Sequence, residues 1–115
     1  MKNETVYLRH IRDAVAKIES YTRDGKTEFL EQSIIQDSVI RNLEIIGEAA
    51  RNLSPEFRKK HSKVPWRGIM AMRNVLVHEY FGVDLPIVWR VVSKRIPALK
   101  RHISKIMKNQ EGLEK

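Results

Sequence analysis

Apolar residues in the first part of the chain recur at intervals of three or four residues. This spacing predicts an amphipathic α-helix, whose buried face repeats with a period of 3.6 residues. Asp24-Gly25 predicts the end of this helix, because glycine accepts the positive φ of a C-terminal cap. The apolar positions of the face are Leu8, Ile11, Val15, Ile18 and Tyr21.

A second and longer segment with the same period begins near Thr27. Its apolar stripe is wide enough to predict a central helix that is contacted on two sides. The stripe consists of Ile35, Val39, Leu43, Ile46, Ala50 and Leu53, and it is widened by Ile34, Ile40, Ile45 and Ala49.

Prolines mark the start of the next two helices. Ser54-Pro55 combines an N-cap with proline at the first helical position, and predicts a helix of one or two turns that ends near residues 61–62. Pro65 starts the following helix by the same logic, and Gly82 is expected to end it. The expected inner face of that helix is Trp66, Ile69, Met70 and Val77.

The last helix is predicted to begin at Asp84, which caps it, with Pro86 in its first turn. Pro97 lies deep in this helical pattern and predicts a kink or break between Ser93 and Pro97, because proline removes a backbone donor. No stretch alternates apolar and polar residues long enough to predict a strand. We therefore expect an all-α bundle of four or five helices, formed by residues 1–108 and followed by a frayed polar tail at 109–115.

Composition narrows the class of protein. The chain has 115 residues, no cysteine, and neither a signal-peptide pattern nor an apolar run long enough to span a membrane, so we expect a single cytoplasmic domain. The net charge is +8, and residues 58–78 contain six basic side chains and no acidic one. A stretch of this kind attracts polyanions. We interpret four of its side chains as candidates for steering an RNA substrate: Lys59, Lys60, Lys63 and Arg67.

The segment from Arg73 to Tyr80 brings together unusual chemistry. Arginine suits bidentate phosphate binding, histidine transfers protons near neutral pH, and tyrosine offers a hydroxyl that can be modified. Arg73, with Asn74 beside it, and His78 could therefore cleave a phosphodiester without a metal ion. On a straight helix His78 lies about 140° from Arg73, so the helix must end near His78 or a second chain must complete the site. Alternatively, His78 and Tyr80 only cap and pack a helix end.

Other residues allow weaker interpretations. Arg41 and Glu48 lie seven residues apart on one face of the second segment, where they either orient Arg73 or His78 or are solvated surface charges. Asp37, Glu44 and Glu48 are weak evidence for acid–base chemistry. Trp66 and Trp89 are interpreted as core or interface aromatics. Four scattered histidines with no i, i+4 pair predict no metal site, and no cofactor is expected.

The string MRNVLVHEYFGVD, preceded by Trp66 and followed by LPIVW, resembles the HepT-like branch of the HEPN superfamily. Members carry an R-x4-H-x-Y motif, which Arg73, His78 and Tyr80 match. The stretch DSVIRNLEIIGEAARNLSPEF is similar to the family's second helix and the residues after it. The resemblance covers nearly the whole chain.

The resemblance implies an all-α HEPN bundle that is active as a homodimer. It also implies the toxin of a HEPN/MNT (type VII) toxin–antitoxin system: a metal-independent ribonuclease acting on RNA, including tRNA, with Arg73 and His78 in the active cleft. The antitoxin would be an MntA-type nucleotidyltransferase that uses ATP to transfer AMP onto Tyr80.

Two other functions compete with this hypothesis. In one, the chain is a non-catalytic nucleotide- or substrate-binding subunit of a minimal nucleotidyltransferase. In the other, it is a helical DNA-binding module, which the absence of a clear helix-turn-helix pair disfavours.

Overall fold

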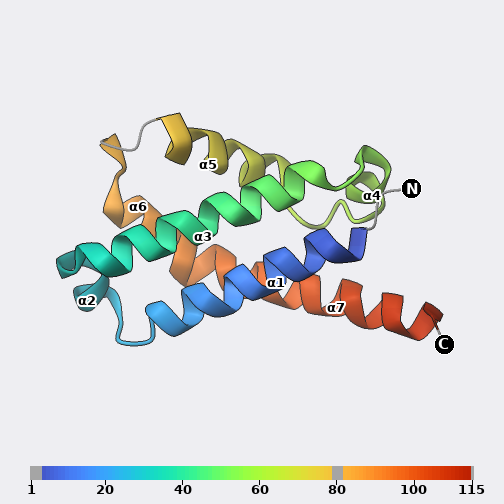
Figure 1. Ribbon diagram of the computed structural model, residues 1–115, viewed down its shortest axis with the longest axis horizontal. Helices are drawn as coiled ribbons and strands as arrows, with labels where there is room; N and C mark the ends of the chain where they lie inside the picture. Colours follow the sequence, from blue (N-terminus) through green and yellow to red (C-terminus); the bar gives the residue numbers. More distant parts are fainter. Residues whose placement is uncertain (1–3, 79–81, 115) are drawn as a thin grey trace.

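Helix α3 (Ser33–Asn52) is the central element of the fold, with α1 (Glu4–Tyr21) packed along one side and α5 (Trp66–His78) along the other. The computed structural model describes residues 4–78 and 82–114. Figure 1 shows α7 (Ile96–Glu114) running beneath α1 on the side opposite α5. The remaining elements are α2 (Lys26–Glu31), α4 (Pro55–Lys60), α6 (Leu85–Arg90) and the π-helical turn η2 (Val91–Arg95).

The all-α class is confirmed, and the described ranges contain no strand. Four long helices (α1, α3, α5 and α7) make the bundle, in agreement with the expected architecture. Three further helices of six residues each, α2, α4 and α6, connect them. Helix α7 extends to Glu114 and so includes most of the predicted tail, whose fraying stays a prediction.

The single long helix predicted from Thr27 onward is wrong, because Gln32 separates α2 from α3. Its backbone is extended (φ −114°, ψ 112°). The Nε2 group of Gln36 donates to the carbonyl oxygens of Phe29 and Leu30 at 2.9 and 3.1 Å, so that the open end of α2 is satisfied by a side chain of α3. Phe29 is fully buried and holds α2 on the core.

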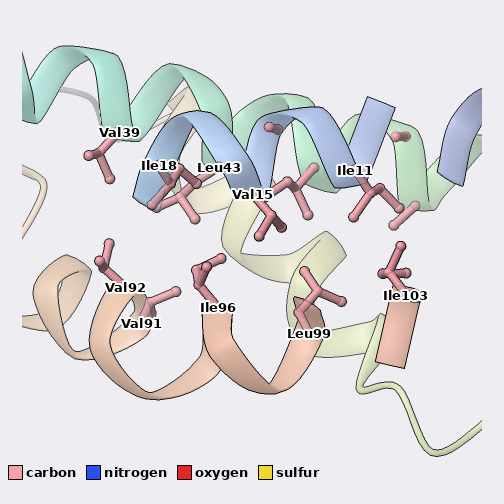
Figure 2. Packing of buried hydrophobic residues seen from close by; sticks show 14 of the residues in the cluster. Ile11, Val15, Ile18, Val39, Leu43, Val91, Val92, Ile96, Leu99 and Ile103 are labelled. Carbon is pink, nitrogen blue, oxygen red and sulfur yellow. The ribbon is translucent and has the colours of Figure 1, made fainter. Parts of the chain in front are cut away.

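The core lies where α1, α3 and the η2–α7 segment meet (Figure 2). Side chains from all three segments point into the space between them. Burial of this apolar surface is the main contribution to the stability of the bundle. The labelled residues in Figure 2 are Ile11, Val15, Ile18, Val39, Leu43, Val91, Val92, Ile96, Leu99 and Ile103, and all of them are buried.

Three residues predicted to lie on buried faces are exposed instead: Tyr21 (41%), Ile34 (72%) and Val77 (41%). Tyr21 is the last residue of α1 and Ile34 the second residue of α3, so both lie at helix ends. In α5 the buried position near the C-terminus is Leu76 and not Val77. Trp66 is buried and Ile69 and Met70 pack against the core as predicted, so only the last position of the predicted face differs.

The predicted helix starts are confirmed at atomic detail. The Ser54 hydroxyl accepts a hydrogen bond from the Phe57 amide at 3.1 Å, and an Asp84 carboxylate oxygen accepts one from Ile87 at 3.2 Å. Gly25 has a positive φ of 95°, but α1 already ends at Tyr21, and Gly25 stands at the N-cap of α2 instead of capping the first helix. The expected end near Gly82 falls partly on residues 79–81, which lie outside the described residues.

The expected interruption near Pro97 is present as the π turn η2. Pro97 becomes the second residue of α7, a position where its missing N–H costs little. Trp66 is buried and donates its indole N–H to the His61 carbonyl at 3.0 Å, and Trp89 packs on Phe29 with ring centroids 5.4 Å apart. Both tryptophans are thus structural aromatics.

Candidate active site

The position of Arg73 is set by an unusually close contact between α3 and α5. A Cβ atom on Gly47 would overlap the Cβ of Arg73, lie 2.8 Å from its Cγ and lie 3.2 Å from the Ile69 carbonyl oxygen. A glycine at position 47 therefore lets the two helix backbones approach, and the stem of Arg73 crosses directly over α3.

The guanidinium group of Arg73 is held from two sides. Its Nη2 atom lies 3.3 Å from a carboxylate oxygen of Glu48, and its Nη1 atom donates to the Asn74 side-chain oxygen at 3.0 Å. The Arg73 side chain is 23% exposed, so part of it still reaches solvent. A guanidinium has five N–H donors, and the remaining ones are available to an anion.

A hollow of about 500 Å³ places Arg73, Asn74 and His78 along one wall. We call it the His78 hollow, and its lining is Gly47, Arg51, Met70, Arg73, Asn74 and His78. From the angular separation of about 140° on a helical wheel, we expect that Arg73 and His78 can share a site only if the helix ends near His78 or a second chain completes the site. Helix α5 does end at His78. They border the same hollow because Arg73 has a long side chain and because His78 lies at the C-terminal end of α5.

Arg51 is a lining residue that the sequence reasoning did not single out. It lies on α3 one turn after Gly47, and it adds a second arginine to the hollow that holds His78. The i, i+4 spacing places Arg51 on the same face of α3 as Gly47, but it indicates a place in the site only once Gly47 is known to face α5. The result is a hollow rich in cationic groups, suited to a phosphate.

Arg41 and Glu48 belong to a second hollow, of about 350 Å³, between α1, α3 and α5. We call it the Tyr7 hollow, and besides Arg41 and Glu48 its lining includes Tyr7, His10, Glu44, Arg73 and Val77. Of the two sequence interpretations for Glu48, orientation of Arg73 agrees with the observed ion pair. Arg41 lines this hollow together with Arg73 and not the one that holds His78.

The four steering candidates line neither hollow. Lys59 and Lys60 end α4, Lys63 lies in the following turn, and Arg67 is in the first turn of α5; all four are exposed. Arg58, from the same basic stretch, is different: its Nη1 donates to the carbonyl oxygens of Ala50 and Arg51 at 3.1 and 3.2 Å. It therefore closes the C-terminal end of α3, while its neighbours remain available to an anionic partner.

One predicted site residue falls outside the residues that the structure describes. Tyr80 lies outside the described residues, so its place relative to Arg73 stays a prediction. Across residues 4–78 and 82–114, no three His, Asp or Glu side chains gather in a way that could hold a metal ion, and no helix is long and apolar enough to cross a membrane.

An apolar pocket of about 180 Å³ lies between α5, η2 and α7. Its walls are mainly aliphatic, and three basic side chains (Lys94, Arg95 and His102) complete them. None of the predicted site residues lines it. The chemistry suited to a phosphodiester is instead concentrated around Arg73.

Comparison with known proteins identifies the family of the chain. A family model described as Ribonuclease HepT-like matches residues 11–106. The chain is 50% identical over 108 residues to a Methanocaldococcus jannaschii protein whose name joins a gamma-glutamylcyclotransferase to a candidate RNase; this covers 92% of the chain and 48% of that relative.

Two further relatives are matched along most of their length. A candidate RNase of Caldanaerobacter subterraneus is 41% identical over 112 residues, covering 96% of the chain and 100% of the relative. A protein named "Probable ribonuclease HepT" from Thermococcus cleftensis is 44% identical over 103 residues, covering 89% of the chain and 94% of the relative. No solved structure gives a significant match.

Proposed function

Because the chain belongs to the HepT-like ribonuclease family, we propose that it cleaves RNA with Arg73 and His78 and without a metal ion. The observation that supports this proposal most directly is the shared hollow: Arg73, held by Glu48 and Asn74, borders the same space as His78. The names of the relatives from Caldanaerobacter subterraneus and Thermococcus cleftensis point to the same activity.

The reaction proposed is attack of a ribose 2′-hydroxyl on the adjacent phosphorus. Arg73 binds the phosphate oxygens and stabilises the negative charge that grows on them. His78 accepts the proton of the 2′-hydroxyl. The new bond joins the 2′-oxygen to phosphorus, the bond from phosphorus to the 5′-oxygen breaks, and the leaving 5′-oxygen takes a proton from water. The products are a 2′,3′-cyclic phosphate and a free 5′-hydroxyl.

Single substitutions in the purified protein test this proposal. We expect Arg73→Ala and His78→Ala to abolish cleavage of a labelled RNA in the presence of EDTA and to abolish growth arrest in cells. Arg101→Ala, which changes an exposed arginine on α7, serves as the matched control and should leave both unchanged. Cleavage that survives in both site variants, or that requires a divalent ion, would refute the proposal.

We further propose that the chain is the toxin of a HEPN/MNT system, acting as a homodimer in the cytoplasm. Its antitoxin would be an MntA-type nucleotidyltransferase that uses ATP to place AMP on Tyr80. Tyr80 is two residues after His78 in sequence, and an added phosphate would repel the RNA backbone and compete for Arg73. Val75, which is 52% exposed on α5 and lines neither hollow, offers apolar surface for a second copy.

The same experiments separate this proposal from the competing nucleotide-binding subunit. If the chain is such a subunit, its expression alone is harmless and the activity of the companion transferase falls when the chain is absent. The toxin hypothesis predicts the opposite: expression alone stops growth, and the companion protein relieves the arrest.

A further inference from the structure

The Tyr7 hollow adjoins the proposed catalytic arginine but has walls of a different character. Among the described residues, Arg73 is the one that lines both hollows. The volume of the Tyr7 hollow, about 350 Å³, lies within the range of about 300 to 1,000 Å³ that is usual for small-molecule pockets. A phosphate held by Arg73 therefore has space for one nucleotide on each side.

Two aromatic rings from α1 form one wall of this hollow. The rings of Tyr7 and His10 meet edge to face, with centroids 6.2 Å apart and planes at 85°. Tyr7 is partly buried and packs against the core, which fixes its orientation, whereas His10 is exposed. A flat base can stack on one of the two rings while the other borders its edge. Stacking on aromatic side chains is the usual way in which single-stranded RNA bases are held.

Glu44 is one of the polar residues that line the hollow, together with Arg41, Glu48 and Asn52. Its side chain is half-buried, and it makes no hydrogen bond or ion pair with the other described residues, whereas the neighbouring Glu48 is paired with Arg73. An ionised carboxylate only accepts hydrogen bonds. The Watson–Crick edge of guanine carries two adjacent donors, its N1–H and its amino group, whereas the other three bases place acceptors beside a single donor group. A free carboxylate thus favours guanine.

We infer that the Tyr7 hollow binds the base of the nucleotide that follows the cleaved phosphate, and that Glu44 makes guanine the preferred base. The inference rests on the proposed function, which assigns His78 to the 2′-hydroxyl of the preceding nucleotide. That nucleotide occupies the His78 hollow, so the base on the other side of Arg73 belongs to the nucleotide that carries the leaving 5′-oxygen.

Binding of mononucleotides tests the inference without depending on cleavage. Guanosine 5′-monophosphate and adenosine 5′-monophosphate are each titrated into the full-length protein, with the dissociation constants measured calorimetrically. We expect the guanine nucleotide to bind at least about fivefold more tightly, as expected when one base makes an additional bidentate contact. Glu44→Gln should bring the two constants within about twofold, whereas Glu31→Gln, which changes an exposed glutamate of α2, should leave their ratio unchanged.

The aromatic wall is tested with Tyr7→Leu and His10→Ala. Loss of the stacking ring should weaken both nucleotides by about fivefold or more while retaining the preference for guanine. Tyr21→Leu is the matched control, because Tyr21 is an exposed tyrosine at the other end of α1. Thermal unfolding of each variant establishes that it is folded. If Tyr7→Leu does not fold, the nucleotide affinities of His10→Ala test the aromatic wall.

The outcomes distinguish this inference from the proposed function. RNA cleavage by the wild type together with equal affinity for the two nucleotides, or a guanine preference that survives Glu44→Gln, overturns the guanine site and leaves the ribonuclease intact. Guanine-selective binding without any RNA cleavage supports the site and overturns the ribonuclease. A preference for cutting before guanosine that disappears in Glu44→Gln supports both.

Discussion

Gly47 on α3 and Arg73 on α5 lie so close that the glycine leaves no room for a side chain between them. A methyl group at position 47 would meet the Cβ and Cγ of Arg73 and the Ile69 carbonyl, and the backbone atom cannot move aside without moving α5. This contact couples the packing of the bundle to the placement of the proposed catalytic arginine.

Gly47→Ala should therefore reduce both stability and activity. Overpacking in a well-packed contact typically costs about 1 to 3 kcal/mol, and the better helix propensity of alanine offsets up to about 1 kcal/mol of this. Urea unfolding measures the stability, and single-turnover RNA cleavage measures the activity, which we expect to fall by about a hundredfold as Arg73 is displaced.

Gly68→Ala is the matched control for that experiment. A Cβ atom at Gly68 would have its nearest neighbour, Arg95 Nη1, at 4.0 Å, so the methyl group fits. The substitution should leave cleavage unchanged and raise the free energy of unfolding by up to about 1 kcal/mol. A Gly47→Ala variant that matched Gly68→Ala in both measurements would contradict the importance of the close contact.

Features that depend on a few neighbouring residues were predictable from the sequence, whereas features that depend on contacts between helices, such as the Gly47 contact, were not. Ser54 and Asp84 each cap a helix by a hydrogen bond to an amide three residues away, so their capping roles could be predicted from the local sequence. The break at Gln32 depends on Gln36 reaching back to the end of α2, and a periodic pattern carries no signal for it. Likewise, Leu76 is buried and Val77 is exposed, and which of two adjacent apolar residues faces the core depends on packing between helices rather than on the sequence of α5 alone.

For the candidate site, the motif residues were predictable and their neighbours were not. Arg73, Asn74 and His78 are close in sequence, and one family motif names two of them. Arg51, Tyr7 and Glu44 come from other helices, and their relevance depends on the packing of α1, α3 and α5. Residue type alone could not distinguish them from the other surface arginines, tyrosines and glutamates of the chain.

Removing the charge of Glu48 should affect cleavage more than stability. Glu48 is 50% exposed and its ion pair with Arg73 is 3.3 Å long, so its loss should change the free energy of unfolding by less than about 1 kcal/mol. With Glu48→Gln, Arg73 loses one of the two groups that hold it, and kcat should fall about tenfold with KM unchanged or lower. Glu19→Gln, which removes the surface pair with Lys100, should leave both constants unchanged.

Within the basic stretch, we expect Arg58 to contribute to stability, and Lys59 and Lys60 to contribute to RNA binding. Lys59→Ala with Lys60→Ala should weaken RNA binding and reduce the dependence of log Kd on log salt by about 0.7 for each phosphate that is no longer neutralised, without altering stability. Arg58→Ala should instead cost about 1.5 to 3 kcal/mol of stability, because the end of α3 is deprived of two hydrogen bonds from a charged group. Equal salt dependence in the wild type and the double variant would rule out steering by these lysines.

His61 should make the protein less stable in mild acid. Partial burial lowers the pKa of His61 below its ordinary value of 6.5, and the positive charge of Lys60 lowers it further. The unfolded chain then binds a proton more readily than the folded one, so this contribution to stability is complete above pH 6.5 and is lost as the pH falls below it. Urea unfolding at about pH 7 and about pH 5 should show a larger loss for the wild type than for His61→Gln.

Modification of Tyr80 is the prediction on which the proposed regulation depends. The intact mass of the chain, purified with and without its genomic neighbour, should differ by whole AMP units when that neighbour is a nucleotidyltransferase. Tyr80→Phe should abolish the increase, whereas Tyr21→Phe, which alters an exposed tyrosine on α1, should retain it. The modified protein should also bind RNA more weakly, because each AMP adds a negative phosphate close in sequence to His78. Unchanged RNA affinity after modification would contradict the charge-based account, and an unchanged mass would leave inhibition by complex formation alone.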